Sequence, residues 1–214
     1  EIAAAVAREA ARQKGLPFDG NQPKLLNTGT AQAPKEIEYT ADMIGSVYEQ
    51  SLDSSIRRHG GVHYTPYEVA KKLVRIALHG LPFGPICDPS VGGGAFLLAA
   101  GEYLAEKGAS PSKIINEYLW GIDLDQGAIE VARASISIWG STKVWIAVNE
   151  HLAVADSLKS GIESFPIPPR RGFIAVIGNP PFQNQLQEIT VRPIEETQKL
   201  RKKWKVNAGP YADT

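Results

Sequence analysis

The sequence predicts an α/β fold with a parallel, doubly wound sheet, and three features of the chain indicate it. From residue 85 onward, short apolar runs alternate with stretches of helical periodicity. A polar residue follows each of four apolar runs, and three consecutive glycines come soon after the first run. Strands that alternate with helices form parallel sheets, with the connecting helices on both faces. Ligands of such sheets bind beyond the carboxyl ends of the strands.

Composition limits the class of protein. A chain of 214 residues is long enough for one sizeable α/β domain with a helical extension. The 23 basic and 23 acidic residues give a formal net charge of zero, so any surface for nucleic acid must be local. The single cysteine, Cys87, excludes an internal disulfide and fits a cytoplasmic location. No apolar run approaches the roughly 18 residues that a membrane span needs, so we expect no membrane partner.

The N-terminal part is expected to be helical. Residues 1–14 are rich in alanine and charge, and residues 41–57 carry apolar side chains at helical spacing. Between these helices, three prolines with scattered glycines and asparagines indicate an irregular segment. We therefore expect a helical extension with a linker over residues 1–58 and the main domain over residues 59–214.

A further helix is expected to begin near Thr65. Threonine is a good N-cap, the following proline suits the first helical position, and Glu68 is placed to close a capping box. Apolar residues then recur at helical spacing, and we expect them to face the core. They are Val69, Leu73, Ile76 and Ala77.

Four strands and their connecting helices should follow. The expected strands are residues 85–88, 119–123, about 151–155 and 173–178. The expected helices are residues 95–107, one that starts near 112, and residues 126–138. The last strand is a continuous apolar run, which is typical of a strand buried on both faces. Residues 144–148 are an alternative for the third strand.

The polar residues that close the four strands predict a lined crevice. They are Asp88, Asp123, Asp156 and Asn179. Asp123 stands where an acid can accept hydrogen bonds from both ribose hydroxyls of an adenosine ligand. Its alternative role is to cap the next helix. Since Asp125 is better placed for that cap, we predict Asp123 to be the ligand residue. Asp156 can accept from an exocyclic amine, or it is a simple turn residue.

The three glycines at residues 92–94 allow a ligand to approach the backbone closely, just before a helix with free N–H groups. They do not form the dinucleotide pattern Gly-x-Gly-x-x-Gly, because Phe96 holds the later position. The lysine of a phosphate-binding loop is also absent from this segment. A tight turn between strand and helix is the alternative explanation.

The most specific motif is the run Asn-Pro-Pro-Phe that closes the last strand. Two prolines stiffen the strand end and offer no backbone N–H, so an asparagine side chain and a proline carbonyl remain as acceptors for an amino group. The phenylalanine offers a face on which a planar base can stack. A structural turn is the alternative. The predicted catalytic residues are Asn179, Pro180, Pro181 and Phe182.

Five segments in this order resemble the γ-type N6-adenine DNA methyltransferases, the family of type I modification subunits and fused restriction–modification enzymes. They are residues 61–66, 88–97, 121–125, 155–158 and 178–182. The resemblance implies a Rossmann-like fold and S-adenosylmethionine as cofactor. It also implies transfer of a methyl group to N6 of a flipped adenine in double-stranded DNA, within a restriction–modification or phage-defence system. A protein-glutamine or RNA N-methyltransferase and a non-catalytic fragment remain alternatives.

The resemblance also implies roles for single residues. Thr65 and Asp88 would seat the methionine part of the cofactor, Asp123 the ribose, and Asp156 the adenine amine. The full predicted cofactor set is Tyr64, Thr65, Asp88, Pro89, Ser90, Gly92, Gly94, Phe96, Asp123, Leu124, Asp156 and Ser157. No metal site is expected, since the histidines lack cysteine or acidic partners nearby.

A basic stretch follows the catalytic motif. Residues 189–205 hold six basic and two acidic residues with Trp204 among them, so they could follow a DNA backbone or form a solvated helix face. The chain begins with Glu1 in mid-helix pattern and encodes fewer strands than the family's sheet. We therefore expect a piece of a longer protein, with target recognition supplied by a fused domain or a specificity subunit.

Overall fold

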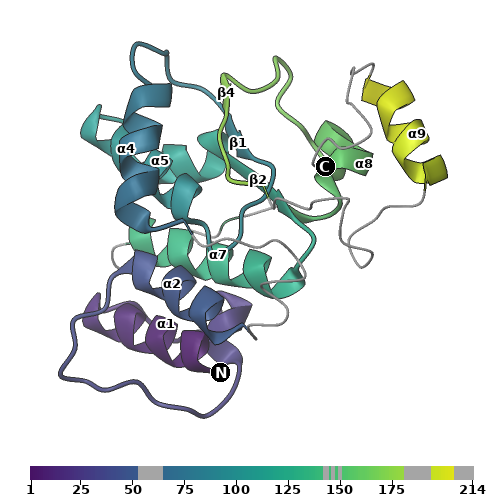
Figure 1. Ribbon diagram of the computed structural model, residues 1–214. Coiled ribbons are helices and arrows are strands. Elements are labelled where there is room, and N and C mark those ends of the chain that lie inside the picture. Colours follow the sequence, from purple (N-terminus) through teal and green to yellow (C-terminus); the bar gives the residue numbers. More distant parts are fainter. Residues whose placement is uncertain (53–64, 142–144, 146–147, 149–150, 181–193, 205–214) are drawn as a thin grey trace.

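A four-stranded parallel sheet forms the centre of the protein (Figure 1). The computed structural model describes residues 1–52, 65–141, 145, 148, 151–180 and 194–204. The strands are β1 (Ile86–Asp88), β2 (Leu119–Asp123), β3 (Leu152–Val154) and β4 (Ala175–Val176). Their order is β3-β2-β1-β4, so the chain moves outward from β1 and then crosses to its other side. The predicted parallel, Rossmann-like sheet is confirmed, and its switch point lies between β1 and β4.

The fourth strand differs from its prediction. Two residues are in β4, although Ile174 N and Ile177 N extend the pairing by donating to Pro85 O at 2.8 Å and Cys87 O at 2.9 Å. Val176 is 64% exposed, so β4 is not the buried strand that the apolar run predicted. In the described part β4 pairs with β1 alone, and one of its sides is therefore open.

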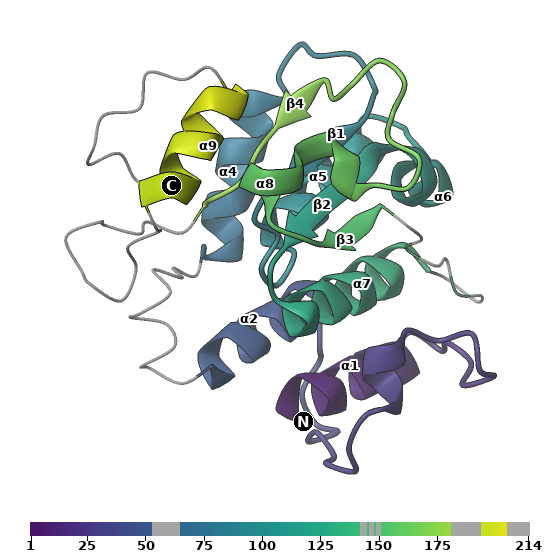
Figure 2. The same ribbon diagram turned by 90° about the vertical axis from the view of Figure 1, so that its right-hand side faces the viewer.

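Three longer helices lie on one face of the sheet, and the second and third of them have bounds close to those predicted. They are α4 (Tyr67–Ala77), α5 (Ala95–Glu106) and α7 (Gln126–Gly140). The short α6 (Pro111–Lys113) and the π-helix η2 (Ile114–Tyr118) lead into β2. The main core forms between these helices and the sheet. The opposite face carries Trp120 and Ile122 against Phe165, near α8 (Ser157–Ser160) and η3 (Gly161–Ser164) (Figure 2).

Helix α4 is rotated relative to its prediction. Its buried side chains are Ala70 and Val74, and the C-cap Leu78 continues the same spacing of four residues. The predicted core residues are exposed: Val69 by 44%, Leu73 by 46%, Ile76 by 75%, and Ala77 as well. The cap also differs, because Pro66 is the N-cap and no side chain caps the helix.

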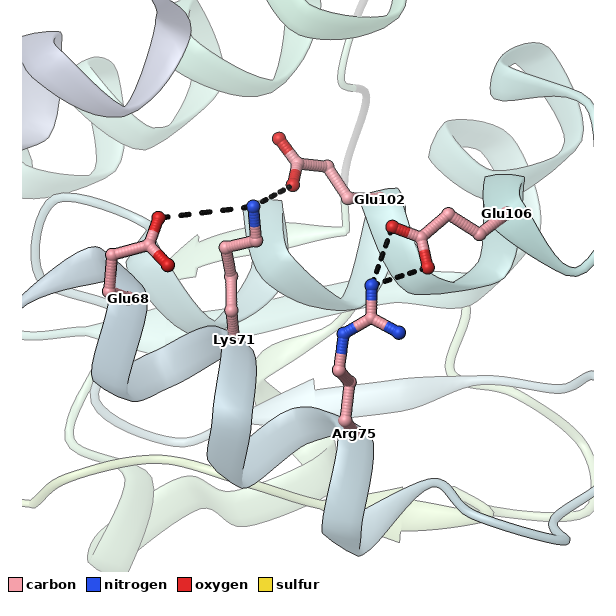
Figure 3. A network of polar contacts seen from close by, with 5 residues as sticks. All are labelled: Glu68, Lys71, Arg75, Glu102 and Glu106. Carbon is pink, nitrogen blue, oxygen red and sulfur yellow. Dashed lines mark hydrogen bonds and ion pairs between the residues drawn. The ribbon is translucent and has the colours of Figure 1, made fainter.

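Ion pairs to α5 accompany this rotation (Figure 3). Lys71 Nζ lies 3.3 Å from Glu102 Oε2, and Arg75 Nη2 lies 2.5 Å from Glu106 Oε2. These two cations lie about one turn apart on α4, so both project from the side of α4 that faces α5. The small Ala70 lies on the buried side and allows the close approach of the two helices.

The N-terminal helices pack against the α/β part. Helices α1 (Ile2–Gln13) and α2 (Ala41–Ser51), with the 3-10 helix η1 (Lys24–Asn27), share an apolar cluster with α7. Lys14 Nζ donates to the carbonyls of Trp139 at 2.6 Å and Ser141 at 3.1 Å, which fastens α1 to the C-terminal end of α7. The end of the second predicted helix, beyond residue 52, lies outside the described residues. Within the described ranges, no helix is both long and apolar enough to span a membrane.

Candidate active site at the switch point of the sheet

Polar groups from β1 and from the segment after β4 meet at the switch point. Asp88 ends β1, and Asn179 follows β4 by three residues. Between them, Gly178 lies so close to Asp88 that a Cβ on Gly178 would be 2.4 Å from Asp88 Oδ1. Glycine at this position therefore allows the chain that carries Asn179 to pass directly beside the aspartate.

Asp88 is a fully buried acid, and one of its two carboxylate oxygens has no hydrogen-bond donor among the described residues. Its Oδ1 accepts from the backbone N–H of Ser90 at 2.9 Å and from the Ser90 hydroxyl at 3.4 Å. No described residue donates a hydrogen bond to Oδ2, which is buried. Burial raises the pKa of Asp88 to about 7, with a smaller contribution from the charge of Asp123. A cationic donor at this oxygen would offset the cost of burying the charge.

The glycine loop between β1 and α5 is lined by carboxylates. Gly92 and Gly94 have left-handed backbone conformations, with φ of 51° and 90°, which suit glycine. The backbone N–H of Gly92 donates to Asp123 Oδ2 at 2.8 Å, and that of Gly93 donates to Glu49 Oε1 at 2.8 Å. Two successive N–H groups of the loop therefore face acids, and a phosphate placed there would meet two negative charges.

Asp123 connects the loop to the start of α7. Its Oδ1 accepts from the backbone N–H of Asp125 at 2.9 Å. Burial raises the pKa of Asp123, and the hydrogen bonds from Asp125 and Gly92 oppose that rise. Asp125 caps α7 by accepting from Gly127 N at 2.8 Å, as predicted, and also accepts from the hydroxyl of Tyr48. Asp123 is therefore not the cap, and its role toward a ligand stays a prediction.

Asn179 is held by Thr65. The side-chain Nδ2 of Asn179 donates to the Thr65 hydroxyl oxygen at 3.1 Å. The predicted N-cap role of Thr65 is wrong, because α4 begins at Tyr67 and Thr65 faces the segment after β4 instead. Pro180 is exposed beside it. The predicted site residues Tyr64, Pro181 and Phe182 lie outside the described residues.

The other predicted cofactor residues have varied surroundings. Asp156 caps α8, where its Oδ1 accepts from Leu158 N at 3.0 Å and Lys159 N at 3.2 Å. Ser157 is the first residue of that helix. Phe96 is 6% exposed and packs in the main core, whereas Leu124 is 67% exposed. Pro89 is half-buried next to Asp88.

Comparison with known proteins identifies the family. A family model described as N-6 DNA Methylase matches residues 39–212. The chain belongs to this family. The Type II methyltransferase M.VspI of Vibrio sp. (strain 343) is 31% identical over 93 residues, which cover 44% of this chain and 21% of that protein. The Type II methyltransferase M.XamI of Xanthomonas campestris pv. amaranthicola is 26% identical over 178 residues, with coverages of 82% and 29%.

The chain thus spans less than a third of each of these curated relatives. Among solved structures, the DrdV–DNA complex matches with a TM-score of 0.55 and 18% identity, over 81% of this chain and 20% of that one. Similarity at this level shows the shared fold. The predicted family resemblance is confirmed by the family match.

The sequence motifs did not point to Glu49, which contacts the glycine loop from α2. One signal was present: a glycine, Gly45, lies inside the helical pattern, and an acid follows four residues later on the same face. In the part of the chain that the structure describes, no three histidine, cysteine, aspartate or glutamate side chains are grouped to hold a metal ion.

Proposed function

We propose that this chain is the catalytic part of a DNA methyltransferase that transfers a methyl group from S-adenosylmethionine to N6 of adenine. The observation that carries the proposal is the position of Asn179, held by Thr65 and adjacent to Asp88 at the switch point. Membership of the N-6 DNA Methylase family supports DNA adenine as the substrate. The relatives named Type II methyltransferases support a place in restriction–modification, with a recognition domain or specificity subunit as partner.

The residues at the switch point fit a cationic cofactor. Asp88 has a buried oxygen without a described partner, and Asp123 lies across the glycine loop from it. The acids beside the loop disfavour phosphates, and this argues for S-adenosylmethionine over NAD. We assign Asp88 to the methionine part, Asp123 to the ribose and Asp156 to the adenine amine. A cytoplasmic location is part of the same proposal.

The mechanism depends on acceptors around the target nitrogen. The amino group of adenine is a poor nucleophile, because its lone pair is delocalised into the ring. Asn179 Oδ1 and the Pro180 carbonyl would accept its two N–H bonds and favour a tetrahedral nitrogen with the lone pair free. When bound, S-adenosylmethionine supplies a methyl group that N6 takes over by direct displacement as the carbon–sulfur bond breaks.

Asn179 and its neighbours need not remove a proton before attack. The proton on N6 becomes acidic once the new carbon–nitrogen bond has formed, and water can accept it. Phe182 would stack on the flipped base, which supplies about 1–3 kcal/mol. The base must leave the duplex for its amino group to reach Asn179.

Helix α9 (Ile194–Trp204) is the proposed contact to the DNA backbone. Lys203 Nζ donates to Lys159 O at 2.5 Å and lies 3.7 Å from Glu163 Oε2, so its charge is partly used to hold α9 against η3. Lys199 and Lys202 are exposed. Phosphates would bind these two lysines by charge, with affinity that falls as salt rises.

Identification of the methylated product tests the proposal. The purified protein is incubated with labelled S-adenosylmethionine in three separate reactions. One contains genomic DNA, one total RNA and one protein extract. The expected product is N6-methyladenine in DNA. Label on RNA or on glutamine side chains would support the alternative substrates and contradict the proposal.

A further inference from the structure

Helix α2 touches the glycine loop through a pair of glycines. A Cβ on Gly45 would lie 2.5 Å from Gly93 O, and a Cβ on Gly93 would lie 2.6 Å from Gly45 Cα. The backbone of α2 at Gly45 therefore contacts the backbone of the glycine loop at Gly93, so this face of α2 packs against the loop. Residues four apart share a helix face, so Glu49 lies on the same face as Gly45. Its Oε1 accepts from Gly93 N at 2.8 Å.

A second contact holds α2 in this position. The hydroxyl of Tyr48 donates to Asp125, which also caps α7. The backbone N–H of Asp125 in turn donates to Asp123. The position of Glu49 is thus fixed in two ways. The glycine loop bonds Glu49 itself, and the start of α7 bonds its neighbour Tyr48. Fixed groups bind a ligand without losing side-chain freedom.

The other carboxylate oxygen of Glu49 lacks a hydrogen-bond partner within the described part of the chain. Glu49 Oε2 is buried, and no described residue donates a hydrogen bond to it. None of the ion pairs in the described part of the chain includes Glu49. Burial raises the pKa of Glu49, and the charge of Asp123 raises it further. Such an oxygen is costly unless a donor reaches it, and a cation offsets the cost best.

We infer that Glu49 binds the α-ammonium group in the amino-acid part of S-adenosylmethionine. The inference rests on the proposed function and adds a residue from outside the recognised motifs. Within the amino-acid part, the ammonium is the group that both donates hydrogen bonds and carries positive charge; the sulfonium has no N–H. The ribose and adenine donors are assigned to Asp123 and Asp156. Asp88, assigned to the methionine part, can share the ammonium with Glu49, because an ammonium has three N–H donors.

Two ligands distinguish binding of the ammonium group by Glu49 from a contact between Glu49 and another part of the cofactor. S-Adenosylhomocysteine carries the ammonium, whereas 5′-methylthioadenosine keeps the adenine, ribose and sulfur without it. Glu49→Gln keeps an oxygen for Gly93 N–H and replaces the charged acceptor by an amide. Calorimetry should show affinity for S-adenosylhomocysteine reduced by about tenfold to a hundredfold, the effect of losing a hydrogen bond between charged groups. Affinity for 5′-methylthioadenosine should be unchanged.

The control is Glu38→Gln, which removes the same charge from an exposed position and should leave both affinities unchanged. Where Glu49 is ionised, the ligand-free melting temperature of Glu49→Gln should equal or exceed that of the unmutated protein, because a partly buried charge is removed. A lower melting temperature with unaltered affinities would make Glu49 purely structural and overturn the inference.

Equal loss of affinity for both ligands would place Glu49 at the ribose or adenine, and would also overturn the inference. Failure of the unmutated protein to bind S-adenosylhomocysteine would instead contradict the proposed function. The two proposals therefore fail in different ways.

Discussion

The side-chain amide of Asn179 donates a hydrogen bond to the hydroxyl of Thr65, which lies 114 positions earlier in the chain, at a distance of 3.1 Å. This contact joins the segment just before α4 to the segment after β4. An amide has one donor end and one acceptor end. In the observed orientation the nitrogen of Asn179 is bonded to Thr65, and its oxygen is the acceptor left for a substrate amino group. Thr65 is thus a positioning residue for the proposed reaction.

Substitution of Thr65 tests this role. Thr65→Val keeps the shape but removes the acceptor, so kcat should fall by about fivefold to tenfold, the effect of one neutral hydrogen bond. Thr65→Ser keeps a hydroxyl and should restore most of kcat. Calorimetric affinity for S-adenosylhomocysteine should stay unchanged in both variants. Reduced cofactor affinity with an unaltered kcat would instead support the cofactor role that the sequence resemblance implies for Thr65.

The buried Asp88 predicts a dependence of stability on pH. Its pKa is about 7 in the folded protein against an ordinary value of 3.8, so between these values the folded chain holds a proton that the unfolded chain has released. The contribution of this group to the free energy of unfolding is therefore full below about pH 4 and lost as pH rises toward 7. Asp88→Asn stays neutral throughout and should be the more stable protein at neutral pH and above, by up to a few kcal/mol.

Thermal unfolding without cofactor, measured from about pH 5 to about pH 8, checks this result. The difference in melting temperature between Asp88→Asn and the unmutated protein should widen as pH rises. Glu38→Gln, at an exposed position, should show no such trend. A difference that does not vary with pH would mean that Asp88 is ionised throughout this range.

The contact between Gly45 and Gly93 predicts an unusual sign for a glycine substitution. In an exposed helix, alanine stabilises by about 1 kcal/mol relative to glycine. Here the added Cβ would lie 2.5 Å from the backbone oxygen of Gly93, so the backbone of α2 or of the glycine loop would have to shift. Gly45→Ala should therefore lower the free energy of unfolding by about 1–3 kcal/mol. Chemical denaturation measures it; Gln50→Ala, exposed on the same helix, should change stability by at most about 0.5 kcal/mol. A stabilised Gly45→Ala protein would show that α2 is free to shift.

Much of this fold and site could be predicted from the sequence, because it depends on local signals. The bounds of β2, α5 and α7 follow from hydrophobic periodicity, and the Asp125 cap follows from its place before a helix. The convergence of Asp88 and Asn179 follows from parallel topology, since the carboxyl ends of neighbouring strands share one edge.

The features that differed depend on partners distant in the chain. Helix α4 has apolar residues on two sides, and pairing of Lys71 and Arg75 with α5 accompanies the burial of one side. Periodicity alone does not distinguish these sides. The contact of Glu49 with the loop likewise requires Gly45 and Gly93 to meet, and they lie far apart in sequence. Such contacts come from packing rather than from a local pattern.

Phe182, outside the described residues, is predicted to hold the flipped base. Phe182→Ala should weaken capture of the base by about 1–3 kcal/mol, because stacking is lost. Phe182→Trp should retain most of it. Fluorescence of 2-aminopurine at the target adenine rises when the base unstacks, and titration of such duplexes measures capture. Equal binding by the alanine and tryptophan variants would exclude a stacking role.

Asn179 provides the most direct test of the mechanism, because its oxygen is the acceptor proposed to free the lone pair of N6. Asn179→Ala removes both this oxygen and the contact with Thr65. Loss of one pre-organised polar group at a reacting centre costs about a hundredfold to a thousandfold in kcat, so turnover should nearly vanish. Cofactor affinity by calorimetry should survive, since Asp88 and Asp123 are untouched. Asn179→Asp keeps an acceptor, and the Thr65 hydroxyl can donate to it, so this variant should retain more activity than Asn179→Ala. Turnover of Asn179→Ala close to that of the unmutated protein would mean that methyl transfer does not depend on an acceptor at this strand end.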